Sequence, residues 1–209
     1  MSTKKSHTCL LVDRSPAGKL IFASDRRQSW GMHLAQKTPR PKTVKRHGIV
    51  FAGTGDSYIC DLICELLPIP KQRKTESAFD FAHGALWESV IRLLDKKGLL
   101  DEKQFCLPRE YKFSEAIILI GIQQTLFELE ISKRGISMGI IDTPYAHGCG
   151  GAYALGALIA FKDYNCFPHH IVRFIPQEHE LISKMKLAVQ IAGNLSPGCD
   201  EEVDIVKGD

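Results

Sequence analysis

Two apolar runs near the start of the chain predict a β-hairpin. The segments Thr8 to Asp13 and Lys19 to Ser24 are almost continuously apolar, and the turn-forming residues Ser15 to Gly18 separate them. Because polar residues do not alternate with the apolar ones, we expect both faces of this hairpin to be buried, as in the middle of a layered sandwich.

A second hairpin and two helices follow along the chain. Lys42 to Arg46 and Ile49 to Ala52 flank His47-Gly48, a dipeptide suited to a tight turn. Asp56 is expected to cap a helix that ends before two prolines, and a longer helix is expected from about Glu76 to Lys97. The apolar residues at helical spacing, which we expect to be buried, are Ile59, Leu62, Ile63, Leu66 and Leu67 in the first helix and Phe79, Ala82, Leu86, Val90, Ile91 and Leu94 in the second.

The second half of the chain completes an α+β pattern. Three strands of a meander are expected at 117–122, 126–131 and 136–141, then helices at 150–161 and 179–193 and a last strand at 202–206. Pairs of helices placed between sheet segments fit a four-layer αββα sandwich, with helices outside and two sheets inside. We therefore predict one domain over residues 8–209, preceded by a short extension or propeptide at residues 1–7.

The bulk composition narrows the class of protein. The chain has 209 residues and a net charge of +3, which is too small to indicate nucleic-acid binding. No apolar run approaches the ~18 residues of a membrane helix, and no signal-peptide core follows the basic start. The seven cysteines are scattered and complete no metal site at usual spacing, so we expect reduced thiols in a cytoplasmic protein without metal or cofactor.

Thr8 is a candidate nucleophile. A threonine hydroxyl needs an adjacent base, and the residue's own α-amine, with a pKa near ~8 when free, is one solution. That solution requires cleavage of the chain after His7. A nearby lysine would lower the proton affinity of neighbouring groups, and an aspartate would hold that lysine in place. Asp25 and Lys42 are the candidates, because each lies at the edge of a predicted hairpin strand near the start of the first strand.

The order of these segments resembles the proteasome β-subunit family, which includes the bacterial ATP-dependent proteasome-like peptidase and proteasome-like proteins of bacteria and phages. The similarity covers nearly the whole chain, and its strength comes from the order of several short motifs. The matching stretches are Thr8 to Val12, Gly18 to Arg27, Lys42 to Arg46, Gly48 to Asp56, Gly148 to Leu158 and Ile191 to Gly198. The resemblance implies the N-terminal-nucleophile (Ntn) hydrolase fold, which agrees with the predicted layers.

The resemblance also implies a threonine peptidase that removes its own propeptide. Thr8 would be the nucleophile, with its freed amine as the general base. Lys42 would supply the activating charge, Asp25 would orient the lysine, and Arg27 would support the aspartate. A backbone amide in the turn at Gly53 would stabilise the oxyanion, because a donor held there meets negative charge as it develops.

Four features depart from the family pattern. His7 precedes the cleavage point, where self-processing members commonly carry glycine. Asn194 and Cys149 stand at site positions where the family tends to have aspartate and serine. The spacing from Thr8 to the Asp-Arg-Arg corner is one residue longer than usual, whereas Cys9 fits without a gap. Cys9 therefore stays open as an alternative nucleophile.

These features predict a threonine peptidase that hydrolyses peptides or proteins within a homo-oligomeric ring, in the cytoplasm or, if phage-encoded, in the host cytoplasm. An ATPase unfoldase is left open as a partner, and neither nucleic acid nor a membrane is expected as one. Two alternatives stay open. One is a catalytically inactive proteasome-fold protein with a structural or assembly role that keeps its N-terminal extension, and the other is an Ntn amidase acting on a small amide.

Overall fold

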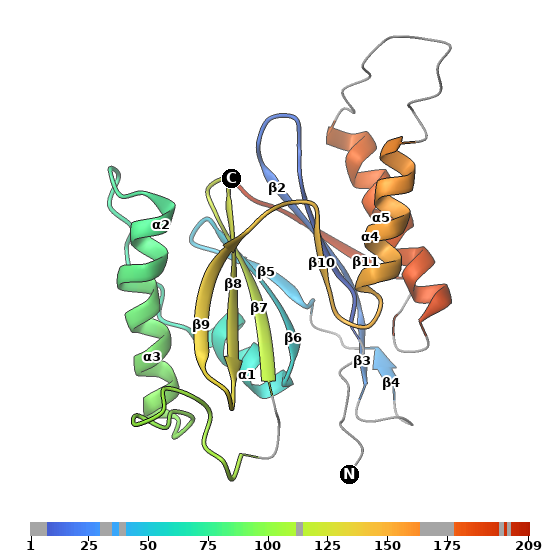
Figure 1. The fold of residues 1–209 in the computed structure, drawn as a ribbon. Helices are drawn as coiled ribbons and strands as arrows, with labels where there is room; N and C mark the ends of the chain where they lie inside the picture. Colours follow the sequence, from blue (N-terminus) through green and yellow to red (C-terminus); the bar gives the residue numbers. More distant parts are fainter. Residues whose placement is uncertain are drawn as a thin grey trace. The chain divides into compact units, whose positions relative to one another are not determined.

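The chain forms two compact units, each with its own large antiparallel sheet and its own helices (Figure 1). The structure, a computed structural model, describes residues 8–29, 35–37, 41–111, 115–163, 178–196, 199 and 202–209. The first unit consists of Met1–Thr43 and Asp142–Lys207, and the second of Val44–Ile141 and Gly208–Asp209. The predicted single domain over residues 8–209 stays a prediction.

The first unit is built on a four-stranded antiparallel sheet in the order β10-β1-β2-β11. Its strands are β1 (Leu10–Arg14), β2 (Leu20–Asp25), β10 (Tyr145–His147) and β11 (Val203–Lys207). The first predicted hairpin is confirmed as β1 and β2, with Leu11 opposite Ala23. All six residues of β2 and the first four of β1 are buried, as the continuous apolar pattern predicted.

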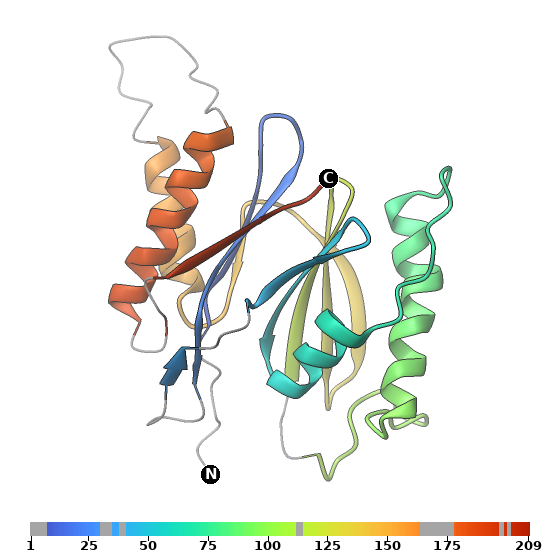
Figure 2. The same cartoon turned by 180° about the vertical axis from the view of Figure 1, so that it is seen from behind.

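Two helices, α4 (Gly151–Asp163) and α5 (Glu178–Leu195), cover one face of this sheet (Figure 2). They pack on each other, and alternate residues of β1 and β2 join them in one apolar core. Both helices and the last strand were predicted to within about two residues. Two short strands, β3 (Arg27–Ser29) and β4 (Ala35–Lys37), form a separate ribbon that the sequence did not predict.

The second unit contains a five-stranded antiparallel sheet in the order β5-β6-β7-β8-β9. Its strands are β5 (Thr43–Arg46), β6 (Ile49–Gly55), β7 (Glu115–Ile122), β8 (Thr125–Ser132) and β9 (Ile136–Ile141). The second hairpin and the meander are confirmed. The turn predicted at Gly53 is wrong, because β6 continues to pair with β7 as far as Gly55, and Gly53 lies within the strand opposite Ile118.

Two helical segments cover one face of the second sheet and share one apolar core with it. The first is α1 (Ser57–Asp61), which continues into the π-helical turn η1 (Leu62–Leu66). The second consists of α2 (Ala78–Phe81), the π-helical turn η2 (Ala82–Leu86) and α3 (Trp87–Lys96). The predicted cap is confirmed, since Asp56 Oδ1 accepts a hydrogen bond from the Ile59 N–H at 3.0 Å.

Each of the two predicted buried faces contains one residue that is exposed in the structure, and a π-helical turn accounts for each difference. Leu66 and Phe79 were expected in the core, but they are 62% and 51% exposed. Phe81 is fully buried in place of Phe79, and Leu67 is fully buried as predicted. A π turn places i→i+5 hydrogen bonds in the helix, so a stripe extrapolated at 3.6 residues per turn leaves the core-facing side at these points.

Candidate active site

The first unit brings Thr8, Asp25 and Lys42 together. The Lys42 ammonium group donates to Asp25 Oδ1 at 2.8 Å and to Thr8 Oγ1 at 3.2 Å. Asp25 is completely buried, Thr8 is 5% exposed and the Lys42 side chain is 10% exposed. A carboxylate buried in this way is costly unless it has an opposite charge and hydrogen bonds beside it, and Lys42 supplies both.

The backbone of the first hairpin sets the position of this group. Asp25 is the last residue of β2, and Cys9 directly precedes β1 on the neighbouring strand. The Cys9 N–H donates to Asp25 Oδ1 at 2.7 Å, and the Asp25 N–H donates to Cys9 O at 3.2 Å. The carboxylate is therefore held between the backbone that follows Thr8 and the ammonium group of Lys42, whose main chain directly precedes β5.

The two arginines next to Asp25 have separate positions. Arg26 Nε donates to Asp204 Oδ1 of β11 at 2.8 Å, on the exposed side of the sheet. The carboxylate of Asp25 is instead paired with Lys42. Arg27 opens β3, but its side chain lies outside the described part of the chain, so its support of Asp25 stays a prediction.

A second cluster surrounds the backbone carbonyl of Thr8. The Gly150 N–H donates to Thr8 O at 3.4 Å, and the Cys149 thiol donates to it at 3.7 Å. Ser196 Oγ donates to Cys149 Sγ at 3.3 Å, and Cys199 Sγ lies 3.5 Å from the same sulfur. The predicted site residue Cys149 is thus next to Thr8, together with two residues that the sequence analysis did not select.

The signals for those two residues differ. Ser196 lies within the stretch Ile191 to Gly198 that carries the family resemblance. The resemblance therefore included this residue but gave it no role in the site. Cys199 lies just beyond that stretch, and no spacing rule connects it with Cys149, which is 50 residues earlier. Only the packing of α5 against α4 brings these two sulfurs together.

Glycines allow the turn after β10 to approach Thr8. Gly148 has a φ of +92°, and a Cβ built on it would lie 2.0 Å from Thr8 O. A Cβ on Gly150 would lie 2.6 Å from Cys199 Sγ and 3.0 Å from Cys9 Cβ. Close packing therefore accounts for these glycines, as expected for a turn that leads into a helix.

The side chain of Cys9 lies in a different environment from the Thr8 hydroxyl. It is fully buried in the core shared with α4 and α5. Burial first, and then the negative charge of Asp25, raises the pKa of the Cys9 thiol to about 12, while the charge of Lys42 partly opposes this. The hydroxyl in contact with the lysine is that of Thr8, although the choice between the two nucleophiles stays a prediction.

Two other predicted residues lie elsewhere. Gly53 belongs to the second unit, where a Cβ built on it would lie 2.8 Å from Cys60 Sγ. Asn194 is exposed near the end of α5, whereas Ser196, two residues later, is buried and bonded to Cys149. The oxyanion role of Gly53 and the role of Asn194 near the Thr8 amine stay predictions.

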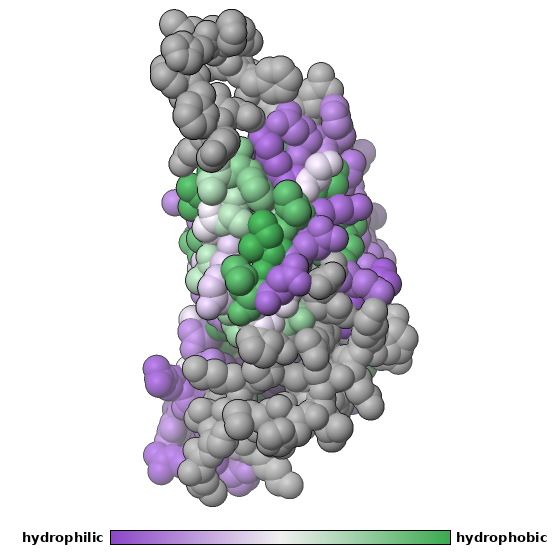
Figure 3. Space-filling view, turned by 90° about the vertical axis from the view of Figure 1, so that its right-hand side faces the viewer, coloured by the Kyte–Doolittle hydropathy of each residue, from purple (hydrophilic) through white to green (hydrophobic). Residues whose placement is uncertain are grey.

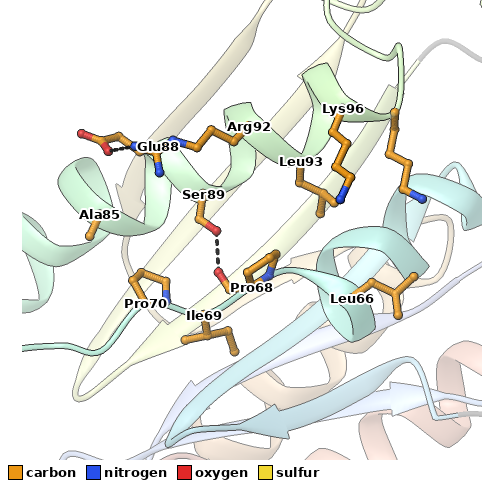
Figure 4. Close-up of a pocket in the computed structure, with 11 residues that line it drawn as sticks. Leu66, Pro68, Ile69, Pro70, Ala85, Glu88, Ser89, Arg92, Leu93 and Lys96 are labelled. Carbon is orange, nitrogen blue, oxygen red and sulfur yellow. Dashed lines mark hydrogen bonds and ion pairs between the residues drawn. The ribbon is translucent and has the colours of Figure 1, made fainter.

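The groove in the second unit is not part of this cluster (Figure 4). It has a volume of about 630 Å³ and lies between the segment Pro68–Ile69–Pro70 and α3. Ser89 Oγ donates to the carbonyl of Pro68 across it, and Glu88 pairs with Arg92 along its rim at 2.8 Å. Among the described residues, no group of three or more histidine, cysteine or acidic side chains is arranged to hold a metal, and no helix is long and apolar enough to span a membrane.

The comparison with solved structures concerns the whole chain. Thiobacillus denitrificans BPH in complex with epoxomicin matches with a TM-score of 0.62 and 16% identity, over 97% of this chain and 98% of that one. Eukaryotic HslV from Trypanosoma brucei matches with a TM-score of 0.59 and 17% identity, over 95% and 98% of the two chains. The chain has a proteasome-like fold. Anbu, the ancestral β-subunit from Yersinia bercovieri, matches with a TM-score of 0.60 and 16% identity, over 96% of this chain and 81% of that one.

The two antiparallel sheets with their helices, and the match to proteasome-like structures, confirm the predicted α+β class. No protein-family model and no curated protein sequence matches the chain. Identities of 16–17% show a shared fold, and a shared fold does not by itself establish a shared function.

Proposed function

We propose that this protein is an Ntn threonine peptidase in which Thr8 is the nucleophile. The observation that carries the proposal is the Lys42 ammonium group, which is bonded both to the Thr8 hydroxyl and to the buried carboxylate of Asp25. A lysine used only to neutralise Asp25 has no need to contact a hydroxyl. A lysine that activates a nucleophile has to make that contact.

Maturation is the first reaction that this arrangement supports. Thr8 Oγ1 attacks the carbonyl carbon of His7, the peptide bond breaks, and the resulting ester is hydrolysed by water. The product is a chain that begins at Thr8 with a free α-amine. That amine is then the base, because it lies on the same residue as the hydroxyl and has a pKa near ~8 in its ordinary environment.

Peptide hydrolysis then repeats the same chemistry on a bound substrate. The amine takes the hydroxyl proton as Thr8 Oγ1 attacks the substrate carbonyl, and the charge of Lys42 stabilises Thr8 Oγ1 as it loses that proton. Asp25 holds the lysine, and its hydrogen bond from the Cys9 N–H fixes the carboxylate relative to the nucleophile. Water finally releases the acyl group from Thr8.

A homo-oligomeric ring is the assembly that we propose for this peptidase. Helix α4 is apolar on its exposed side as well as its buried side, and Figure 3 shows apolar surface on this face of the molecule. The exposed residues of α4 are Ala152, Tyr153, Gly156, Ile159 and Ala160. A helix that is apolar all round is typical of a buried helix, so a second copy of the chain would complete its burial.

Intact mass is the test of maturation. We expect purified wild-type protein to lose the seven residues before Thr8, and the Thr8→Val variant, which keeps the shape but lacks the hydroxyl, to retain them. Thr8→Ser is the matched control, since it keeps a hydroxyl and should still be processed. Wild-type protein that keeps Met1–His7 throughout would instead support the inactive structural role.

A covalent label is the test of the nucleophile. Because Thiobacillus denitrificans BPH was solved with epoxomicin, we propose epoxomicin as the reagent, with intact mass and peptide mapping as the readout. We expect the adduct on Thr8 in both the wild type and Cys9→Ala. An adduct that persists in Thr8→Val and is lost in Cys9→Ala would move the nucleophile to Cys9.

A further inference from the structure

The cluster on the carbonyl side of Thr8 contains two sulfur atoms from distant parts of the sequence. Cys149 lies in the turn between β10 and α4, and Cys199 follows α5. Their sulfurs are 3.5 Å apart, whereas a disulfide bond needs about 2.05 Å. A movement of roughly 1.5 Å would therefore join them, which is within the reach of small side-chain and turn adjustments.

We propose that Cys149 and Cys199 form an oxidisable dithiol, which a peroxide converts into a disulfide beside Thr8. The formation of this disulfide is independent of the proposed peptidase activity. Its effect on catalysis rests on the proposed function.

The two cysteines differ in access to solvent, and this sets the order of the steps. Cys149 is partly exposed and accepts a hydrogen bond from Ser196 Oγ, so it is the thiol that a dissolved oxidant reaches first. Cys199 is 2% exposed, and its hydrogen bond with Cys149, together with burial, raises the pKa of its thiol. Cys199 therefore stays protonated until its neighbour has reacted.

The reaction balances with one peroxide per pair. Cys149 Sγ attacks one oxygen of hydrogen peroxide, the O–O bond breaks, and the products are Cys149 sulfenic acid and water. Cys199 Sγ then attacks Cys149 Sγ, the S–O bond breaks, and the hydroxide leaves with the Cys199 proton as a second water. Two thiols are oxidised, and one peroxide is reduced to two waters.

The disulfide would change the surroundings of Thr8. In the reduced protein the Cys149 thiol donates to Thr8 O at 3.7 Å, and the adjacent Gly150 N–H donates to the same oxygen at 3.4 Å. A disulfide has no S–H, so the first of these bonds is lost, and the turn that supplies the second is tied to Cys199. We expect peptidase activity to fall roughly fivefold and to return on reduction.

Peptide mapping of the full-length protein tests the dithiol without reference to activity. Reduced wild-type protein is freed of reductant, treated with hydrogen peroxide, alkylated and digested. We expect two of the seven thiols to become unavailable and a peptide that links Cys149 to Cys199 to appear. Dithiothreitol should remove it. Unchanged alkylation of both cysteines, or a link from Cys149 to another residue, would overturn the proposal.

Three variants make the assignment specific. Cys199→Ser should stop the reaction at the sulfenic acid of Cys149, which dimedone traps, and Cys149→Ser should abolish the linked peptide. Cys106→Ser, in the second unit, is the matched control and should behave as wild type. If a variant does not fold, the peptide map of the peroxide-treated wild-type protein still tests whether Cys149 and Cys199 become linked. A linked peptide in a protein that never processes its N-terminus would support the dithiol and refute the proposed peptidase. An active peptidase without the linked peptide would support the proposed function and refute the dithiol.

Discussion

Lys42 is the residue on which the candidate site depends, because its ammonium group contacts both Thr8 and the buried Asp25. Lys42→Met keeps an unbranched side chain of similar volume but removes the charge next to the carboxylate. We expect the free energy of unfolding to fall by about 3 kcal/mol, since breaking a buried pair is costly, and N-terminal processing to be lost. Urea unfolding and intact mass measure the two effects.

The double variant Asp25→Asn with Lys42→Met separates stability from catalysis. It removes both charges of the pair, so a large part of the lost stability should return, while Met1–His7 should still be retained. If this neutral pair processes its N-terminus normally, the ion pair is structural and the proposed role of Lys42 is wrong.

Cys9 provides a second test at the residue scale. Its pKa is raised from 9.0 to about 12, so at pH 8 it holds about a thousandfold less thiolate than an ordinary cysteine. We expect iodoacetamide to leave Cys9 unmodified in the native protein at pH 8 while it alkylates Cys149, with peptide mass mapping as the readout. Rapid alkylation of Cys9 would show that it is accessible and favour it as the nucleophile.

The same shift makes stability depend on pH. The folded pKa lies above the unfolded value, so the contribution of the protonated thiol is fully present below about pH 9 and declines as the pH rises toward about 12. The fall in stability over this window should be smaller in Cys9→Ala than in the wild type.

At the scale of elements, the turn between β10 and α4 decides how the Thr8 carbonyl is bonded. Gly148→Ala would introduce a Cβ 2.0 Å from Thr8 O at a φ of +92°, and we expect a loss of about 2–4 kcal/mol in unfolding free energy. Gly156→Ala within α4 is the control. No atom lies within 4 Å of its Cβ position, so higher helix propensity should stabilise the protein by roughly 0.5–1 kcal/mol. Thermal and urea unfolding would compare the two, and equal effects would contradict this account.

The N-cap of α1 carries a second prediction for an element. Asp56 Oδ1 accepts from the Ile59 N–H at 3.0 Å, and Asp56 Oδ2 accepts from the Tyr111 hydroxyl at 3.2 Å. Asp56→Ala removes both acceptors, and we expect a loss of about 1–2 kcal/mol in urea unfolding. Asp56→Asn keeps an oxygen for the cap and should cost less than half as much. An equal loss in both variants would mean that charge, rather than capping, is what matters.

For the whole molecule, the exposed apolar side of α4 predicts self-association. Ile159 is 43% exposed, so Ile159→Glu should leave the stability of the chain within about 0.5 kcal/mol while it disrupts the proposed ring. Mass photometry should show assemblies for the wild type and smaller species for the variant. Gln190→Glu, on the exposed side of α5, is the control and should assemble normally. A monomeric wild type would refute the ring and favour the amidase alternative.

The extent to which the sequence predicted this structure depends on how local each signal is. The β1–β2 hairpin, the Asp56 cap and the β7–β9 meander were predicted because apolar runs, turn residues and capping residues act over a few positions. The predicted burial of Leu66 and Phe79 was wrong, because a π turn changes the number of residues per helical turn and no residue pattern in the sequence indicates it. Strand β10 was missed because three residues carry no measurable alternation.

The sequence by itself determined the two hairpins, the helices and the candidates Thr8, Asp25 and Lys42, because each rests on residue type and short-range spacing. Tertiary structure alone decided that Lys42 bonds to both partners, and that Ser196 and Cys199 gather around Cys149 beside the Thr8 carbonyl. These contacts join residues separated by 17 to 141 positions. Strand pairing and helix packing bring them together, and short-range patterns do not encode either.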